Sequence, residues 1–145
     1  MTRLLVALIF VLVSSQVFAM NSLSDLTWKK RVIIVFADAD DQRLERQVKL
    51  LTDQRAELEE RDLVVVSVIN DEASIAFGNE AKPDAAALRD EADVKKGSFQ
   101  VVLVGKDGGI KLRSETVVPD VELFDVIDRM PMRQAAVSYT HLRAH

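Results

Sequence analysis

The stretch that decides the fold is Phe99-Gln-Val-Val-Leu-Val-Gly-Lys-Asp-Gly-Gly-Ile-Lys-Leu-Arg113. Its first part, Phe99 to Val104, is an apolar run typical of a strand buried on both faces. Asp107-Gly-Gly109 offers positive φ angles and predicts a tight hairpin. The alternation that follows predicts an antiparallel edge strand in which Ile110 and Leu112 face inward. Since a doubly wound sheet would need a helical crossover at this point, the hairpin argues against that architecture.

Two more strands and a helix are expected upstream of this stretch. Val32 to Ala37 is a continuous apolar run, rich in β-branched residues and bounded by charges, which predicts a strand buried on both faces. From Asp41 to about Arg61, leucine and valine recur at helical spacing, which predicts one amphipathic helix. Leu63 to Ile69 is a second apolar strand, so this half of the chain predicts a parallel strand-helix-strand unit.

The remaining segments complete the order of elements. A short helix is expected from Asp84 to Ala92, with Asp84 as its N-cap, and no strand is expected elsewhere between Asn70 and Ser98. Pro119 opens a final helix that ends before Pro131. Its apolar side is expected to consist of Val121, Leu123, Phe124, Ile127 and Met130. The whole order is that of a thioredoxin-like α/β fold with a four-stranded mixed sheet.

The composition excludes whole classes of chemistry. The chain has 145 residues, a formal net charge of −4 and no cysteine, so disulfides, dithiol exchange and thiol peroxidase chemistry are excluded. Its histidines are His141 and His145 and its tyrosine is Tyr139. The chain before position 139 therefore lacks the side chains best suited to acid-base catalysis near neutral pH. We therefore expect no cofactor and favour a role other than catalysis. The acidic charge also argues against a nucleic-acid partner.

The two ends of the chain differ from the body between them. Residues 1–19 have the layout of a cleaved secretory signal peptide, because Arg3 precedes a short apolar run and small residues lead up to Ala19. Residues 20–137 are expected to form a single thioredoxin-like domain. Residues 138–145 are expected to be a non-native or disordered tail, since they resemble a translated adapter sequence. The protein is thus expected in the periplasm or secreted, without membrane association after cleavage.

One candidate site lies where the first strand meets the first helix. Asp38, Asp40 and Asp41 occupy the position at which redox members of a thioredoxin-like fold hold a cysteine, and Ser98 lies in the loop expected beside them. Capping of the helix N-terminus explains these carboxylates without any ligand. A divalent cation is the alternative, although the calcium-loop pattern fails at Arg43 and Lys49. No metal site is therefore assigned.

A second candidate site is the hairpin itself, where Lys106, Asp107, Lys111 and Arg113 cluster in sequence. The segment lacks the Lys-Ser/Thr pair and the helix of a phosphate-binding P-loop. Its three cations can form a small anion-binding patch, or they can serve to block pairing at the sheet edge.

Four stretches carry a family resemblance: Leu26-Thr-Trp-Lys-Lys-Arg-Val-Ile-Ile-Val-Phe-Ala37, Arg61-Asp-Leu-Val-Val-Val66, Leu103-Val-Gly-Lys-Asp-Gly-Gly-Ile-Lys-Leu-Arg-Ser114 and Ile127-Asp-Arg-Met-Pro-Met-Arg133. They resemble the P-DUDES family, a thioredoxin-like domain of unknown function in exported bacterial proteins and in vertebrate sushi-repeat and coiled-coil extracellular-matrix proteins. The resemblance implies the fold and export, and it supplies no catalytic residues.

These observations lead to two functional hypotheses. The first is a non-enzymatic binding or structural module of the cell envelope, with an unidentified protein as its partner. The alternative is a divalent-cation-dependent enzyme or sensor that uses Asp38, Asp40 and Asp41.

Overall fold

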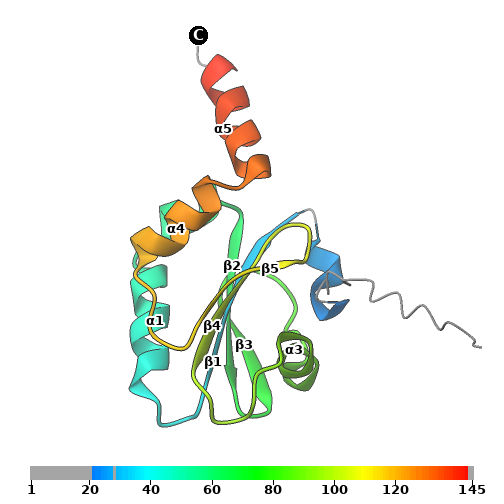
Figure 1. Cartoon of the computed structure of the whole chain (residues 1–145), viewed down its shortest axis with the longest axis vertical. Coiled ribbons are helices and arrows are strands. Elements are labelled where there is room, and N and C mark those ends of the chain that lie inside the picture. The colour runs from blue at the N-terminus through cyan, green and yellow to red at the C-terminus, as the bar shows by residue number, and fades with distance from the viewer. Residues whose placement is uncertain (1–20, 28, 144–145) are drawn as a thin grey trace, which may run out of the picture.

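The computed structural model describes residues 21–27 and 29–143, with side chains for 22–27 and 29–137. Its elements, in chain order, are η1 (Asn21–Leu26), β1 (Arg31–Ala37), α1 (Gln42–Thr52), α2 (Arg55–Glu60), β2 (Leu63–Ile69), β3 (Glu72–Phe77), α3 (Ala85–Ala92), β4 (Gln100–Val104), β5 (Ile110–Ser114), α4 (Asp120–Asp128) and α5 (Pro131–Arg143) (Figure 1). The expected signal peptide, residues 1–19, lies outside the described residues.

The sheet has five strands in the order β3-β2-β1-β4-β5. β1 and β2 are parallel, as the sequence predicts, and the other neighbours are antiparallel. The expected four-stranded sheet is therefore wrong by one strand, β3. Asn70 adopts a φ of +52°, a left-handed conformation that asparagine tolerates better than most residues, and it turns the chain back so that β3 pairs with β2. The fold retains the order of a thioredoxin-like core, with β3 added at one edge.

Helices cover both faces of the sheet. Figure 1 shows α1 and α4 on one side and α3 on the other. Along β1, Ile33 and Val35 pack toward the α1 and α4 side, while Ile34 and Phe36 pack toward α3 and η1. All seven residues of β1 are buried, which confirms the prediction of a strand enclosed on both faces.

The long helix expected from Asp41 to about Arg61 is instead two helices. α1 ends at Thr52, and Gln54 has φ and ψ angles of −111° and 49°, outside the helical region. Leu51 and Leu58 are both fully buried, but the helical position between them is held by the exposed Arg55. α2 resumes at Arg55, whose guanidinium lies 5.4 Å from the centre of the Phe77 ring. Leu58 is buried on the face that an unbroken helix would also give it, so helical spacing alone does not reveal the break.

A bulge alters the predicted edge strand. The pairing of β5 with β4 shifts at Lys111, because Leu112 pairs with Leu103 whereas Ile110 pairs with Val104. The extra residue places Ile110 against the α3 side of the core and Leu112 against the α1 side. The expectation that both side chains face the same way is therefore wrong.

The C-terminal region contains two helices. α4 begins after Pro119 and ends at Asp128, close to the prediction, but Val121 is 72% exposed and does not belong to its apolar side. Pro131 opens α5, which continues to Arg143 through most of the segment expected to be a tail. Figure 1 shows α5 projecting away from the sheet. None of the described helices combines the length and apolar character needed to cross a membrane.

Candidate functional site

The first candidate site is organised by a closed ion pair at the start of α1. The Asp41 carboxylate caps the helix by accepting from the Arg43 backbone N–H at 3.0 Å. The Arg43 guanidinium donates to the same carboxylate from Nε at 2.9 Å and from Nη2 at 2.7 Å. These side-chain hydrogen bonds hold the pKa of Asp41 below its ordinary value. Asp41 is thus a helix cap, as the sequence predicts, and its charge is already matched.

Arg43 also joins α1 to the loop before β4. Its guanidinium carbon lies 4.6 Å from the centre of the Phe99 ring, a cation-π arrangement. The contact brings together the two segments that the sequence predicts to be neighbours. Beside it lies an open groove of about 480 Å³, to whose wall Arg43, Lys95, Ser98 and Glu115 contribute. Sequence reasoning considered Arg43 only as a failed calcium-loop position and missed its contact with Phe99.

The three aspartates do not converge on a point. Asp38 and Asp40 are exposed, and Asp38 accepts a hydrogen bond from the backbone N–H of Ala39 at 2.8 Å. Within the described part of the chain, no group of three or more histidine, cysteine, aspartate or glutamate side chains is arranged to hold a metal ion. The geometry therefore gives the cation hypothesis no support beyond the sequence pattern.

The cations of the hairpin are engaged in separate contacts. Lys106 Nζ lies 2.7 Å from Asp62 Oδ2, and Lys111 Nζ lies 2.7 Å from Asp107 Oδ2. Arg113 instead donates to the Ala92 carbonyl at the end of α3. Lys106 and Lys111 line one pocket, and Lys111 and Arg113 line another. The three predicted cations therefore do not form one anion-binding patch: Lys111 shares one pocket with Lys106 and a different pocket with Arg113.

Asp107 closes the hairpin. Its Oδ1 accepts from the Gly109 N–H at 2.9 Å, and Gly108 adopts a φ of +81°, which favours glycine. Burial acts to raise the pKa of Asp107, but the hydrogen bonds from Lys111 and Gly109 outweigh it and leave the pKa below its ordinary value. Asp107 is therefore a structural acceptor that fixes the turn.

A network of buried arginines at the other end of the sheet was missed by sequence reasoning. Arg61 donates to Asp128 from Nε at 3.0 Å and from Nη2 at 2.9 Å, and its guanidinium lies over Phe124 at 4.6 Å. Arg133 reaches Asp128 at 3.3 Å and Glu60 at 2.7 Å. The network ties α2, α4 and α5 together. A pair of acidic and basic residues from distant segments leaves no local pattern by which it could have been found.

A family model supplies the identification. The model described as a domain of unknown function, DUF4174, matches residues 22–136. The chain belongs to this family. No curated protein matches it. The description of DUF4174 names no activity, so membership of the family establishes which proteins the chain is related to but not what reaction or ligand it has.

Solved structures similar to this DUF4174 chain are thioredoxin-like proteins. A 2-Cys peroxiredoxin from Plasmodium vivax matches with a TM-score of 0.55 and 13% identity over 85% of both chains. A thiol:disulfide interchange protein from Bacteroides sp. matches with a TM-score of 0.52 and 14% identity over 74% of this chain and 76% of the other. The thioredoxin domain of a Bacteroides vulgatus thiol-disulfide oxidoreductase matches at 0.50 with 13% identity, over 74% and 82%. At these identities the likeness shows the thioredoxin-like fold alone, and this chain contains no cysteine.

Proposed function

We propose that the chain is an exported, non-enzymatic binding module of the cell envelope that contacts a protein partner through the groove beside Arg43. The observation that carries the proposal is the closed Asp41–Arg43 ion pair, stacked on Phe99, at the start of α1. It occupies the place where redox members of the fold require a cysteine. The scaffold is therefore retained while the reactive group is replaced by a structural contact.

The side chains around the ion pair support a binding role over a catalytic one. The chain has no cysteine, and its histidines occur only at positions 141 and 145. The groove itself presents exposed side chains of both charges, Lys95 and Glu115, together with the Ser98 hydroxyl. Mixed polar groups of this kind suit the rim of a protein interface. The resemblance to the P-DUDES family, with its exported and extracellular members, supports the same proposal.

The groove is tested by site-specific photo-crosslinking. Ser98 is replaced by p-benzoyl-phenylalanine, and the same replacement at the exposed Gln54, outside the groove, is the control. We expect a discrete crosslink to an envelope protein from position 98 that is absent from position 54. The crosslink should disappear when Lys95→Glu and Glu115→Lys reverse the charges of the groove. Identical products from both positions, or a product insensitive to charge reversal, would contradict the proposed surface.

Export and the absence of turnover are tested separately. N-terminal sequencing of the mature protein should begin at Met20, and a protein that retains residues 1–19 would contradict export. The purified chain should neither reduce disulfides nor consume peroxide, and turnover lost on Asp41→Ala would overturn the non-enzymatic role.

The cation hypothesis is tested by thermal melting. A cation that binds only the native state raises the free energy of unfolding by about 2.7 kcal/mol when its concentration is about 100 times its dissociation constant. A rise in melting temperature with Ca²⁺ or Mg²⁺ that is lost on Asp38→Asn would instead support the cation hypothesis.

A further inference from the structure

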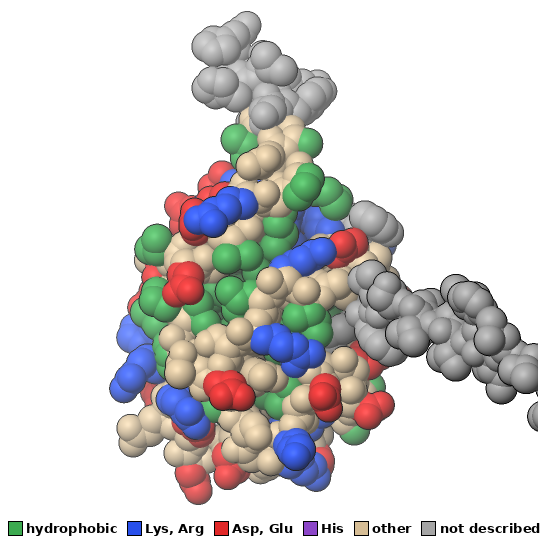
Figure 2. All heavy atoms as spheres, in the orientation of Figure 1, with side chains coloured by type: hydrophobic (Ala, Val, Ile, Leu, Met, Phe, Trp, Pro, Cys, Tyr) green, Lys and Arg blue, Asp and Glu red, His purple; other side chains and the backbone are tan. Residues whose placement is uncertain are grey.

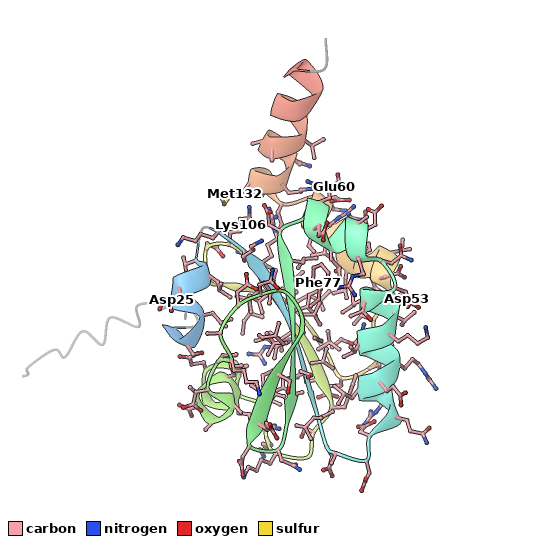
Figure 3. The ribbon with its side chains drawn as sticks, turned by 180° about the vertical axis from the view of Figure 1, so that it is seen from behind. Asp25, Asp53, Glu60, Phe77, Lys106 and Met132 are labelled. Atoms are coloured by element: carbon pink, nitrogen blue, oxygen red, sulfur yellow. The ribbon has the colours of Figure 1, made fainter. Side chains whose placement is uncertain are left out.

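A second pocket lies at the end of the sheet opposite the groove. It has a volume of about 330 Å³ and is formed by the start of β1, the turn between β4 and β5, the end of α4 and the start of α5. Figure 3 shows Lys106 and Met132, two of its lining residues, close together at this end of the sheet. The volume falls within the range of small-molecule sites.

Arg31, the first residue of β1, is a buried cation in the wall of this pocket. The residue is 3% exposed. Its Nη1 donates to the Arg61 carbonyl oxygen at 2.9 Å, while its buried Nε has no hydrogen-bond partner. Among the described residues, no carboxylate lies within ion-pair distance of Arg31. Burial lowers the pKa of Arg31, but an arginine keeps its charge at any physiological pH.

The carboxylates whose charges act on Arg31, Asp62 and Asp128, are already paired with other cations. Asp62 pairs with Lys106, and Asp128 pairs with both Arg61 and Arg133. Buried polar groups in native proteins are normally satisfied, and an arginine without a counter-ion at a pocket wall is an exception that calls for one. A ligand that enters the pocket can supply the missing negative charge.

The rest of the lining indicates what kind of anion fits. Lys106, Lys111 and Arg129 add three cations, and Asp107 is the one carboxylate among the described residues that line the pocket. The remaining wall is largely apolar and is contributed by Val126, Met130, Pro131 and Met132. Figure 2 shows apolar side chains exposed between α4 and β5 below the base of α5, with basic and acidic side chains beside them. A basic group beside an apolar wall suits an anion that carries a compact apolar body.

We propose that this pocket binds a small organic carboxylate, whose acid group pairs with Arg31 and whose apolar body packs on Val126, Met130 and Met132. The planar guanidinium suits a carboxylate because it can offer two parallel N–H donors. The site is separate from the groove beside Arg43 and does not depend on the function proposed for it.

The probe is 3-phenylpropanoate, titrated into the ¹⁵N-labelled protein and followed by NMR. We expect saturable shifts of the Arg31 Nε–H signal and of the Lys106 and Gly108 amide signals. The uncharged 3-phenylpropanamide should bind at least tenfold more weakly, since it cannot neutralise Arg31. Inorganic sulfate, which lacks an apolar body, should also bind at least tenfold more weakly. Equal affinity for the amide would overturn anion recognition, and equal affinity for sulfate would overturn the apolar contribution.

Three variants connect the binding to the pocket. Arg31→Met removes the charge at similar side-chain length and should weaken 3-phenylpropanoate binding at least tenfold. Met132→Glu places a carboxylate on a wall residue that is 43% exposed, so it tests the same site without touching the core. The matched control is Arg55→Met, an exposed arginine on α2 outside the lining, which should leave the affinity unchanged. Unchanged affinity in Met132→Glu, or shifts that do not saturate in the unaltered protein, would overturn the proposal.

Discussion

Gln47 shows how one buried polar side chain holds a connection in place. The residue is 0% exposed. Its Nε2 donates to the Val118 carbonyl at 3.0 Å, and its Oε1 accepts from the Val118 N–H at 2.7 Å. The two bonds fasten the segment before α4 to α1 and satisfy both backbone groups of a buried residue.

Gln47→Leu should therefore destabilise the protein strongly. The substitution leaves the Val118 N–H and carbonyl without partners, at a cost of about 1–3 kcal/mol for each unsatisfied group. Urea unfolding followed by circular dichroism measures the change in the free energy of unfolding. Gln54→Leu is the matched control, because Gln54 is exposed and makes no capping bond with its side chain. Equal unfolding midpoints for the two variants would show that the Val118 bonds contribute little.

Asp128 makes stability depend on pH. Burial acts to raise its pKa, but the hydrogen bonds and charges of Arg61 and Arg133 outweigh burial and hold the pKa below the ordinary value of 3.8. A carboxyl with a depressed pKa in the folded state stabilises the protein above its unfolded-state pKa. That contribution is lost as the pH falls through the lowered pKa.

We expect the stability difference between the unaltered protein and Asp128→Asn to be largest near neutral pH. It should shrink steadily in acid, which urea unfolding measures in steps from about pH 7 to about pH 2. Asp125→Asn serves as the comparison, because the Asp125–Arg129 pair is exposed on both sides and such pairs contribute only about 0–1 kcal/mol. A difference for Asp128→Asn that does not change with pH would contradict the assigned role.

At the scale of elements, the sequence predicts the strands and helices that local residue patterns determine, and it does not predict those that depend on tertiary contacts. β2 was predicted from Leu63 to Ile69 and has those bounds, because a run of apolar β-branched residues has few alternatives to a buried strand. β3 was missed because Ala73, Ser74 and Ala76 give a weak signal, and its pairing with β2 is a tertiary contact. The candidate site shows the same contrast between local and tertiary features. The capping role of Asp41 follows from its place before α1, whereas the Arg43–Phe99 contact joins segments far apart in the chain.

The end of α3 offers a test of backbone conformation. Asp93 ends the helix in the left-handed region, with φ 55° and ψ 49°, which glycine adopts without the steric cost that other residues bear. Asp93→Gly should stabilise the protein by up to about 1 kcal/mol. Ala86→Gly, at an exposed helical position of α3, should have the opposite sign, with a loss of up to about 1 kcal/mol. Thermal melting of both variants measures the signs, and a destabilised Asp93→Gly would contradict the argument.

At the scale of the whole molecule, β1 joins two separate polar sites through a shared core. The Arg31 pocket lies at its start, and the Asp41–Arg43 pair follows its end. Seven extended residues span roughly 20 Å. Alternate residues of the strand belong to the apolar clusters on the two faces of the sheet. The two ends can therefore change independently as long as the central strand stays packed.

Double variants test this independence. Phe99→Leu near the groove and Arg133→Ala in the arginine network share no partner, so their effects on the free energy of unfolding should add to within about 0.5 kcal/mol. Arg61→Ala and Arg133→Ala both remove donors to Asp128. Their combined effect should depart from the sum by more than about 0.5 kcal/mol. Urea unfolding of the single and double variants measures the coupling free energy in both double-mutant cycles. Strong coupling between Phe99 and Arg133 would contradict the independence of the two ends of the sheet.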